Sequence, residues 1–136
     1  MSEATDIQQK MFDLVREHDL NGLRQLYHDD YVYLDAEGEQ PGADAGIAVA
    51  DKYKTAFPDL TFENRSTLAC GDDVAVRELT VRGTHENELD GIAPTGRKIE
   101  VLVCNIVEIR DGKIYREREY YDNYSVLRQL GAISDT

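Results

Sequence analysis

The sequence changes from helical to extended character at Pro58, and no other feature restricts the possible folds as strongly. Before this point, apolar residues recur three and four positions apart, which predicts helices over roughly residues 6–18, after Asn21 and from Asp44 to Phe57. After it, strand-like segments cover residues 61–69, 74–85, 99–110 and 113–121. Helices followed by consecutive antiparallel strands indicate an α+β fold, in which the helices cover one face of a curved sheet.

Shorter signals complete the expected order of elements. Thr5 and Gln8 match a capping box, and residues 31–34 have the composition of a brief strand. Asp111-Gly112 is the kind of dipeptide that a type I′ hairpin turn favours. Residues 125–130, followed by Gly131, predict a short helix. With 136 residues and no repeat or linker, the chain is expected to form one domain over residues 1–136.

The charge balance argues against several kinds of partner. The chain has 27 Asp and Glu against 15 Lys and Arg, and its net charge of -12 repels nucleic-acid phosphates and anionic lipid. Cys70 and Cys104 form no C-x-x-C pair, and the first residues lack the pattern of a signal peptide. No apolar run is long enough to span a membrane. We therefore expect a cytoplasmic protein that binds neither nucleic acid nor membranes.

Residues 99–110 are apolar on both faces of the predicted strand. One face carries Val101, Val103, Val107 and Ile109, and the other carries Leu102, Cys104 and Ile106. A strand with two apolar faces is typically covered on both sides. Because the few predicted helices can cover only one face, a second subunit is expected on the other, as in a homodimer or homotetramer.

Three polar residues occupy positions where an apolar side chain would be easier to bury. Asn105 is in phase with the valines of its strand, His85 ends the preceding strand, and Glu119 alternates with arginines in the last. The alternatives are a hydrogen-bonded core Asn, a structural His and a solvated edge strand. If Glu119 enters the concave side of the sheet, desolvation raises its pKa and suits it to proton transfer.

Other catalytic chemistries have no support in the sequence. There is no G-x-S-x-G elbow, phosphate-binding loop or G-x-G-x-x-G motif, which argues against acyl transfer, phosphoryl transfer and dinucleotide binding. The spacing of His, Cys and carboxylate residues does not suggest a metal site.

Several stretches resemble the SnoaL-like polyketide cyclase family, and they follow one another in the order and spacing of that family. They are AFPDL at 56–60, RGTH at 82–85, GIAPTGR at 91–97, VEIRDGKI at 107–114, and YD at 121–122 with LRQLG at 127–131. The resemblance covers most of the chain and is strongest from about residue 75 to 131. It implies the cone-shaped α+β barrel fold of the nuclear-transport-factor-2-like superfamily.

Members of this family close a ring of a polyketide methyl ester by intramolecular aldol condensation, without a metal or an organic cofactor. Measured from the D-G-K-I turn, the resemblance places the family's acid/base carboxylate at Glu119 and two polar residues near the substrate at Asn105 and His85. It therefore implies that Glu119 moves a proton α to a carbonyl. Asn105 and His85 would orient the substrate and stabilise the enolate.

A small hydrophobic substrate is expected in an apolar pocket that holds this single acid. Residues expected to line it are Tyr33, Tyr53, Phe57 and Val103, and the alternative for each is ordinary core. Two other interpretations stay open. A dehydratase, isomerase or epoxide hydrolase on the same fold needs a second acid/base group, such as His85 or Asp35. A non-catalytic protein that binds a hydrophobic ligand needs none.

Overall fold

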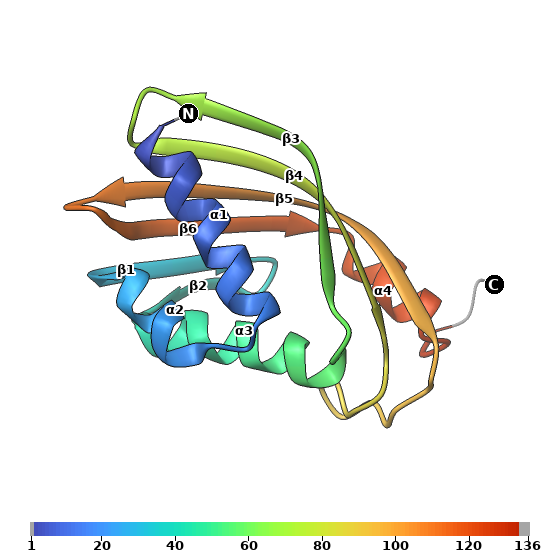
Figure 1. Cartoon of the computed structure of the whole chain (residues 1–136). Coiled ribbons are helices and arrows are strands. Elements are labelled where there is room, and N and C mark those ends of the chain that lie inside the picture. Colours follow the sequence, from blue (N-terminus) through green and yellow to red (C-terminus); the bar gives the residue numbers. More distant parts are fainter. Residues whose placement is uncertain (1, 134–136) are drawn as a thin grey trace.

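The computed structural model of the chain describes residues 2–133 and has the predicted α+β architecture (Figure 1). In chain order, the elements of this part are α1 (Glu3–Arg16), α2 (Leu20–Leu26), β1 (Tyr27–Asp35), β2 (Gly38–Pro41), α3 (Ala43–Ala56), β3 (Thr61–Cys70), β4 (Val74–Thr84), β5 (Lys98–Arg110), β6 (Lys113–Tyr121) and α4 (Asn123–Gln129). The predicted change from helices to strands at Pro58 is confirmed, although β1 is longer than expected and is followed by the unpredicted β2.

The strands form one curved sheet in the order β2-β1-β6-β5-β4-β3. Neighbouring strands are antiparallel except β1 and β6, which are parallel. The sheet is not closed into a barrel, because β2 and β3 lie at opposite edges of this order. β6 lies between β1 and β5, so the alternative of a solvated edge strand for β6 is wrong.

The helices cover the concave face of the sheet. Figure 1 shows α1 passing in front of the sheet, with α3 below it. α1 contacts β3, β4 and β5, α3 contacts β1, and α4 packs against β5. Between these helices and the sheet, two apolar clusters form the core, one around Phe12 and Tyr31 and one around Phe57 and Leu130. In the part of the chain from residue 2 to 133, no helix has the length and apolar character needed to cross a membrane.

The helix caps differ from the predicted ones by a few residues. α1 is capped by Ser2, whose hydroxyl accepts the N–H of Thr5, so Gln8 is free to face the core. Asp19 rather than Asn21 caps α2. α3 begins after Gly42, which has a φ of 94°, and the carboxylate of Asp44 instead pairs with Arg24. These caps lie two or three residues before the predicted ones. At α1 and α2 more than one side chain near the start can accept a backbone N–H, whereas Gly42 has no side chain to do so.

Two turn predictions are confirmed. Asp111 and Gly112 both have positive φ, at 53° and 73°, as a type I′ turn between β5 and β6 requires. Gly131, with a φ of 75°, follows the end of α4. The first of these turns matters for function, because together with a one-residue register shift between Ile109 and Glu108 it places Glu119 opposite Asn105.

The register of β5 directs one face of the strand inward. Val101, Val107 and Ile109 are buried, and Asn105 lies among them with no exposed surface. On the opposite face, Leu102 is 66% exposed. Cys104 and Ile106 on the same outer face are partly buried, and the expected burial of this face by a second subunit stays a prediction.

Candidate active site

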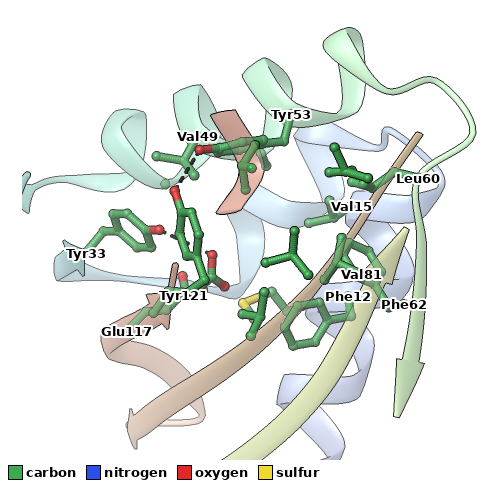
Figure 2. Close-up of a pocket in the computed structure, with 18 of the residues that line it drawn as sticks. Phe12, Val15, Tyr33, Val49, Tyr53, Leu60, Phe62, Val81, Glu117 and Tyr121 are labelled. Carbon is green, nitrogen blue, oxygen red and sulfur yellow. Dashed lines mark hydrogen bonds between the residues drawn. The ribbon is translucent and has the colours of Figure 1, made fainter. Parts of the chain in front are cut away.

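A cavity of about 100 Å³ lies between the concave face of the sheet and helices α1 and α3. Its walls are mostly apolar, with Phe12 and Val15 from α1 and Leu60 and Val81 among the other lining residues. Figure 2 shows the polar groups gathered at one side, where Tyr33, Tyr121 and Glu117 lie together, away from this apolar wall. A pocket of this kind buries the hydrophobic part of a ligand and presents a few polar groups to one end of it.

Two carboxylates from β6 line this cavity, Glu117 and Glu119. They are two positions apart on one strand and therefore share a face of the sheet. Asn105, on β5, is paired with Glu119 in the register of the two strands. Its side-chain nitrogen donates to Oε2 of Glu117 at 2.8 Å and to Oε2 of Glu119 at 2.9 Å. One amide group thus joins the two acids.

Tyrosines from β1 contact the other oxygens of the same carboxylates. The hydroxyl of Tyr31 donates to Oε1 of Glu117 at 2.5 Å, and that of Tyr33 donates to Oε1 of Glu119 at 3.4 Å. β1 runs parallel to β6, so Tyr31 and Tyr33 follow each other in the same direction as Glu117 and Glu119, and each tyrosine meets one acid. Glu117 is therefore held tightly at both oxygens, whereas Glu119 has one weakly held oxygen.

The orientation of the bridging amide follows from Arg77 on β4. A guanidinium can only donate hydrogen bonds, so its Nε must face the oxygen of the Gln8 amide, at 3.0 Å. The nitrogen of Gln8 then faces Oδ1 of Asn105, also at 3.0 Å. The nitrogen of Asn105 is left to face the two carboxylates. Helix α1 and strand β4 therefore determine which end of the Asn105 amide the acids meet.

Burial and like charge alter the proton affinity of both acids. Burial raises the pKa of Glu119 to about 7, and the negative charge of Glu117 adds to this increase. Burial also raises the pKa of Glu117, while its hydrogen bonds from Tyr31 and Asn105 act in the opposite direction. Burial and the charge of Glu119 raise the pKa of Tyr33, which therefore stays a hydroxyl donor. A carboxyl group with a pKa near neutrality can both donate and accept a proton there.

A pair of tyrosine hydroxyls spans the cavity from α3 to β6. The hydroxyl oxygens of Tyr53 and Tyr121 are 2.7 Å apart, and Figure 2 shows this contact above Tyr33. One hydroxyl must donate to the other, which leaves the second with a proton for another acceptor. Tyr121 is two residues beyond Glu119 on the same face of β6. The pair thus offers a hydrogen-bond donor to a substrate oxygen near the acid.

The structure brings together some of the expected site residues and not others. Glu119, Tyr33, Tyr53 and Val103 line the cavity, and Asn105 contacts its acids. The expected enolate contact by Asn105 is not available, because both protons of its nitrogen are directed at Glu117 and Glu119.

His85 and Phe57 lie outside the cavity lining and instead pack against each other, with ring centres 5.5 Å apart. His85 follows the end of β4, donates its N–H to the carbonyl of Arg97 and is fully buried, so it faces inward as the alternation predicts. Its Nδ1 accepts the N–H of Thr95 at 3.2 Å, and its Nε2 is buried without a partner among residues 2–133. His85 is therefore not placed to contact a substrate bound in this cavity, and its expected substrate contact stays a prediction.

The alternative second acid, Asp35, is also absent from the lining, and its Oδ1 accepts from Glu37 and Gln40. The second carboxylate is Glu117, so the expectation of a single acid is wrong. Strand alternation had placed Glu117 on the same face as Glu119 and could have identified it. Gln8 and Arg77 had no such signal, because their role depends on how α1 docks on the sheet. Residues 2–133 contain no group of three His, Cys, Asp or Glu side chains arranged to hold a metal ion.

An open, curved sheet with helices over its concave face and a cavity between them is characteristic of the nuclear-transport-factor-2-like fold. The crystal structure of AclR from Streptomyces galilaeus, a proposed hydroxylase, superposes on this chain with a TM-score of 0.85. The two sequences are 26% identical, and the match covers 97% of this chain and 83% of AclR.

Sequence comparison narrows the assignment. The profile of the SnoaL-like polyketide cyclase family matches residues 5–130, so the chain belongs to this family. It is 38% identical over 85 residues to aklanonic acid methyl ester cyclase AcmA of S. galilaeus. This match covers 62% of this chain and 58% of AcmA, which is less than two thirds of the length of that relative. It is 25% identical over 134 residues to aklanonic acid methyl ester cyclase DnrD of Streptomyces peucetius, covering 96% of this chain and 92% of DnrD.

Proposed function

We propose that the protein is a cyclase that needs no cofactor and closes a ring in a small hydrophobic carbonyl compound, with Glu119 as its acid/base catalyst. The observation that carries this proposal is the position of Glu119, a carboxyl group with a pKa of about 7 at the wall of an apolar cavity. The relatives named as aklanonic acid methyl ester cyclases support the reaction class.

The proposed reaction is an intramolecular aldol addition. The carbon α to one carbonyl loses a proton to Glu119, and that carbon forms a C–C bond to a second carbonyl of the same molecule. The proton then passes from Glu119 to the oxygen of that second carbonyl, so the enzyme returns to its starting state. The free hydroxyl proton of the Tyr53–Tyr121 pair donates a hydrogen bond to the oxygen of the first carbonyl and polarises it. Asn105 acts on the acids rather than on the substrate and is a positioning residue.

The substitution Glu119→Gln tests the proposal, with aklanonic acid methyl ester as the first substrate. Ring closure is followed by liquid chromatography, and exchange of the α protons in D2O is followed by NMR. We expect both rates to fall by at least about 10²-fold, because Gln cannot transfer the proton. Tyr120→Phe is the matched control, since Tyr120 is the neighbouring residue of β6 and is 51% exposed. Near-wild-type rates in Glu119→Gln would remove Glu119 from the mechanism.

The proposal also concerns a second copy of the chain. Leu68, Leu102 and Tyr120 are exposed large apolar residues of β3, β5 and β6, and a partner subunit that covers the outer face would bury them. Light scattering of the wild type at micromolar concentration should give a multiple of 15.4 kDa. Leu102→Glu should reduce the mass to that of one chain. A wild-type mass of one chain would remove the oligomer from the proposal.

A further inference from the structure

Glu117 is a buried carboxylate to which the proposed reaction gives no role. It is 6% exposed, and each of its oxygens accepts a hydrogen bond, from Tyr31 and from Asn105. Burying a carboxylate is costly unless its charge is compensated or removed by a proton. The presence of a second such group beside Glu119 raises the question of how many protons the two groups hold.

The two groups are close enough to interact strongly. Oε2 of Glu117 and Oε2 of Glu119 both lie within hydrogen-bonding distance of the same nitrogen, that of Asn105. Two like charges within about 6 Å of each other strongly disfavour simultaneous ionisation, as in other carboxylate pairs. The pair must therefore be considered as one titrating unit.

No cation offsets a double negative charge at this position. Within residues 2–133, the hydrogen bonds to the two carboxylates come from neutral donors only. Arg77 is separated from the acids by two amide groups, those of Gln8 and Asn105. The titratable and charged groups that face the pair are Tyr27, Tyr31, Tyr33 and Asp35 on β1, Tyr53 on α3, Tyr121 on β6 and, through these amides, Arg77 on β4.

The hydrogen bonds also distinguish the two members. Glu117 receives a strong bond at each oxygen, at 2.5 and 2.8 Å, which favours its ionised form. Glu119 receives one such bond at Oε2, and its Oε1 has only the 3.4 Å contact with Tyr33. That oxygen is the position best suited to hold a proton.

We propose that Glu117 and Glu119 share a single proton in the resting protein, with the charge on Glu117 and the proton on Glu119, so that Glu119 enters the reaction as an acid. The order of proton transfers that follows rests on the proposed function. Glu119 first gives its proton to the carbonyl oxygen of the substrate and then takes the proton from the α carbon. The product of this exchange is a neutral enol, so no second negative charge forms beside Glu117.

Ring closure then proceeds from this enol. The enol carbon forms the C–C bond to the second carbonyl, and the oxygen of that carbonyl receives a proton as the enol oxygen loses one. Protons and electrons balance without any further reactant. Glu117 remains ionised throughout and is a positioning residue, which acts through the proton affinity of Glu119.

The experiment is a titration of the full chain with Glu labelled with ¹³C at its carboxyl carbon, which reports protonation without a substrate. Glu117→Gln and Glu119→Gln assign the two signals, and Glu39→Gln, at an exposed position of β2, is the control for a loss of charge elsewhere. We expect the Glu119 signal to titrate near pH 7 while the Glu117 signal stays ionised. In Glu117→Gln the midpoint for Glu119 should fall by about one pH unit or more, and in Glu39→Gln it should not move.

Other results would overturn the proposal. Ionisation of both groups below pH 5, or a proton that stays on Glu117, contradicts the shared proton or its position. The wild-type titration alone shows whether one or two protons are held, even where a variant does not fold. A single shared proton together with full ring closure by Glu119→Gln would overturn the proposed function and leave the pair intact. Two ionised groups together with an inactive Glu119→Gln would overturn the shared proton and leave the proposed function intact.

Discussion

Gln8 donates two hydrogen bonds from its side-chain nitrogen to Asn105, one to the backbone oxygen and one to the side-chain oxygen, each at 3.0 Å. This contact ties the first helix to the strand that faces the acids, across 97 positions of the sequence. A change in how α1 packs would therefore alter the Asn105 amide directly, although the hydrogen bonds to the carboxylates come from β1 and β5. Gln8 in turn accepts a hydrogen bond from Arg77, whose guanidinium also donates to Gln9 and to the carbonyl of Thr5.

The first prediction concerns this guanidinium. Arg77→Met should lower the free energy of unfolding by about 2–4 kcal/mol, because it leaves several acceptors on α1 without a donor. Arg77→Lys should recover part of the loss, since one ammonium can reach fewer of them. Urea denaturation measures the stability, and the NMR signals of the Asn105 side-chain amide report its orientation. A Met variant as stable as the wild type, with an unchanged amide, would show that Arg77 does not hold this network.

The second prediction concerns Gly46, a helical residue of α3 next to the tyrosines of β1. A Cβ built at this position would lie 2.7 Å from the hydroxyl oxygens of both Tyr27 and Tyr31. Gly46→Ala should therefore destabilise the protein by about 1–3 kcal/mol through this overlap, although Ala is the better helix former by about 1 kcal/mol. Thermal unfolding measures the change. The double variant Gly46→Ala/Tyr27→Phe should regain part of the stability, and stabilisation by Gly46→Ala alone would refute the close approach.

The third prediction is the pH dependence of stability that Glu119 contributes. Because burial raises its pKa to about 7, the folded protein binds a proton that the unfolded chain has already released between about pH 4.5 and 7. The contribution of Glu119 to stability is therefore full below this window and is lost as the pH rises through it. Across the window, the wild type should lose about 1–3 kcal/mol relative to Glu119→Gln, whose side chain does not titrate.

Urea denaturation of both proteins from pH 4.5 to 8 measures this difference directly. Comparison with Glu119→Gln removes the effects of the distant acidic groups, which the two proteins share, whereas Glu117 interacts with Glu119 and contributes to the difference. A constant difference over the whole range would mean that Glu119 has an ordinary pKa.

The fourth prediction concerns His85. His85→Leu should leave ring closure within about threefold of the wild-type rate, because the imidazole lies outside the cavity lining and its Nδ1 is used by Thr95. The chromatographic assay for Glu119→Gln measures this rate. A fall of 10²-fold with the fold retained, as seen by circular dichroism, would return His85 to the mechanism.

The order of elements could be predicted from the sequence because it depends on local patterns. Alternation places Glu117, Glu119 and Tyr121 on one face of β6, and the Asp111-Gly112 turn pairs β6 with β5. The register shift between Ile109 and Glu108, which brings Glu119 opposite Asn105, has no such signal in the sequence. The strand β2 could not be predicted, because Gly38 and Pro41 have low strand propensity and the strand exists only through its pairing with β1.

The details of the site depend on contacts between distant segments. Asn105 was expected to face the substrate, but Gln8 and the two acids use its amide completely. His85 faces inward as expected, but it meets Phe57 and Thr95 rather than the cavity. In both cases the sequence indicated an inward-facing polar residue, whereas only the tertiary structure shows which groups it meets.

The parallel pairing of β1 with β6 has a consequence for folding. Asn105 and Glu119 are 14 positions apart and meet within one hairpin, whereas Tyr31 reaches Glu117 across 86 positions. Long-range contacts close larger loops and form more slowly than local ones. The hairpin of β5 and β6 cannot bury the two acids by itself, so their raised proton affinity depends on the docking of β1 and would report that step during refolding.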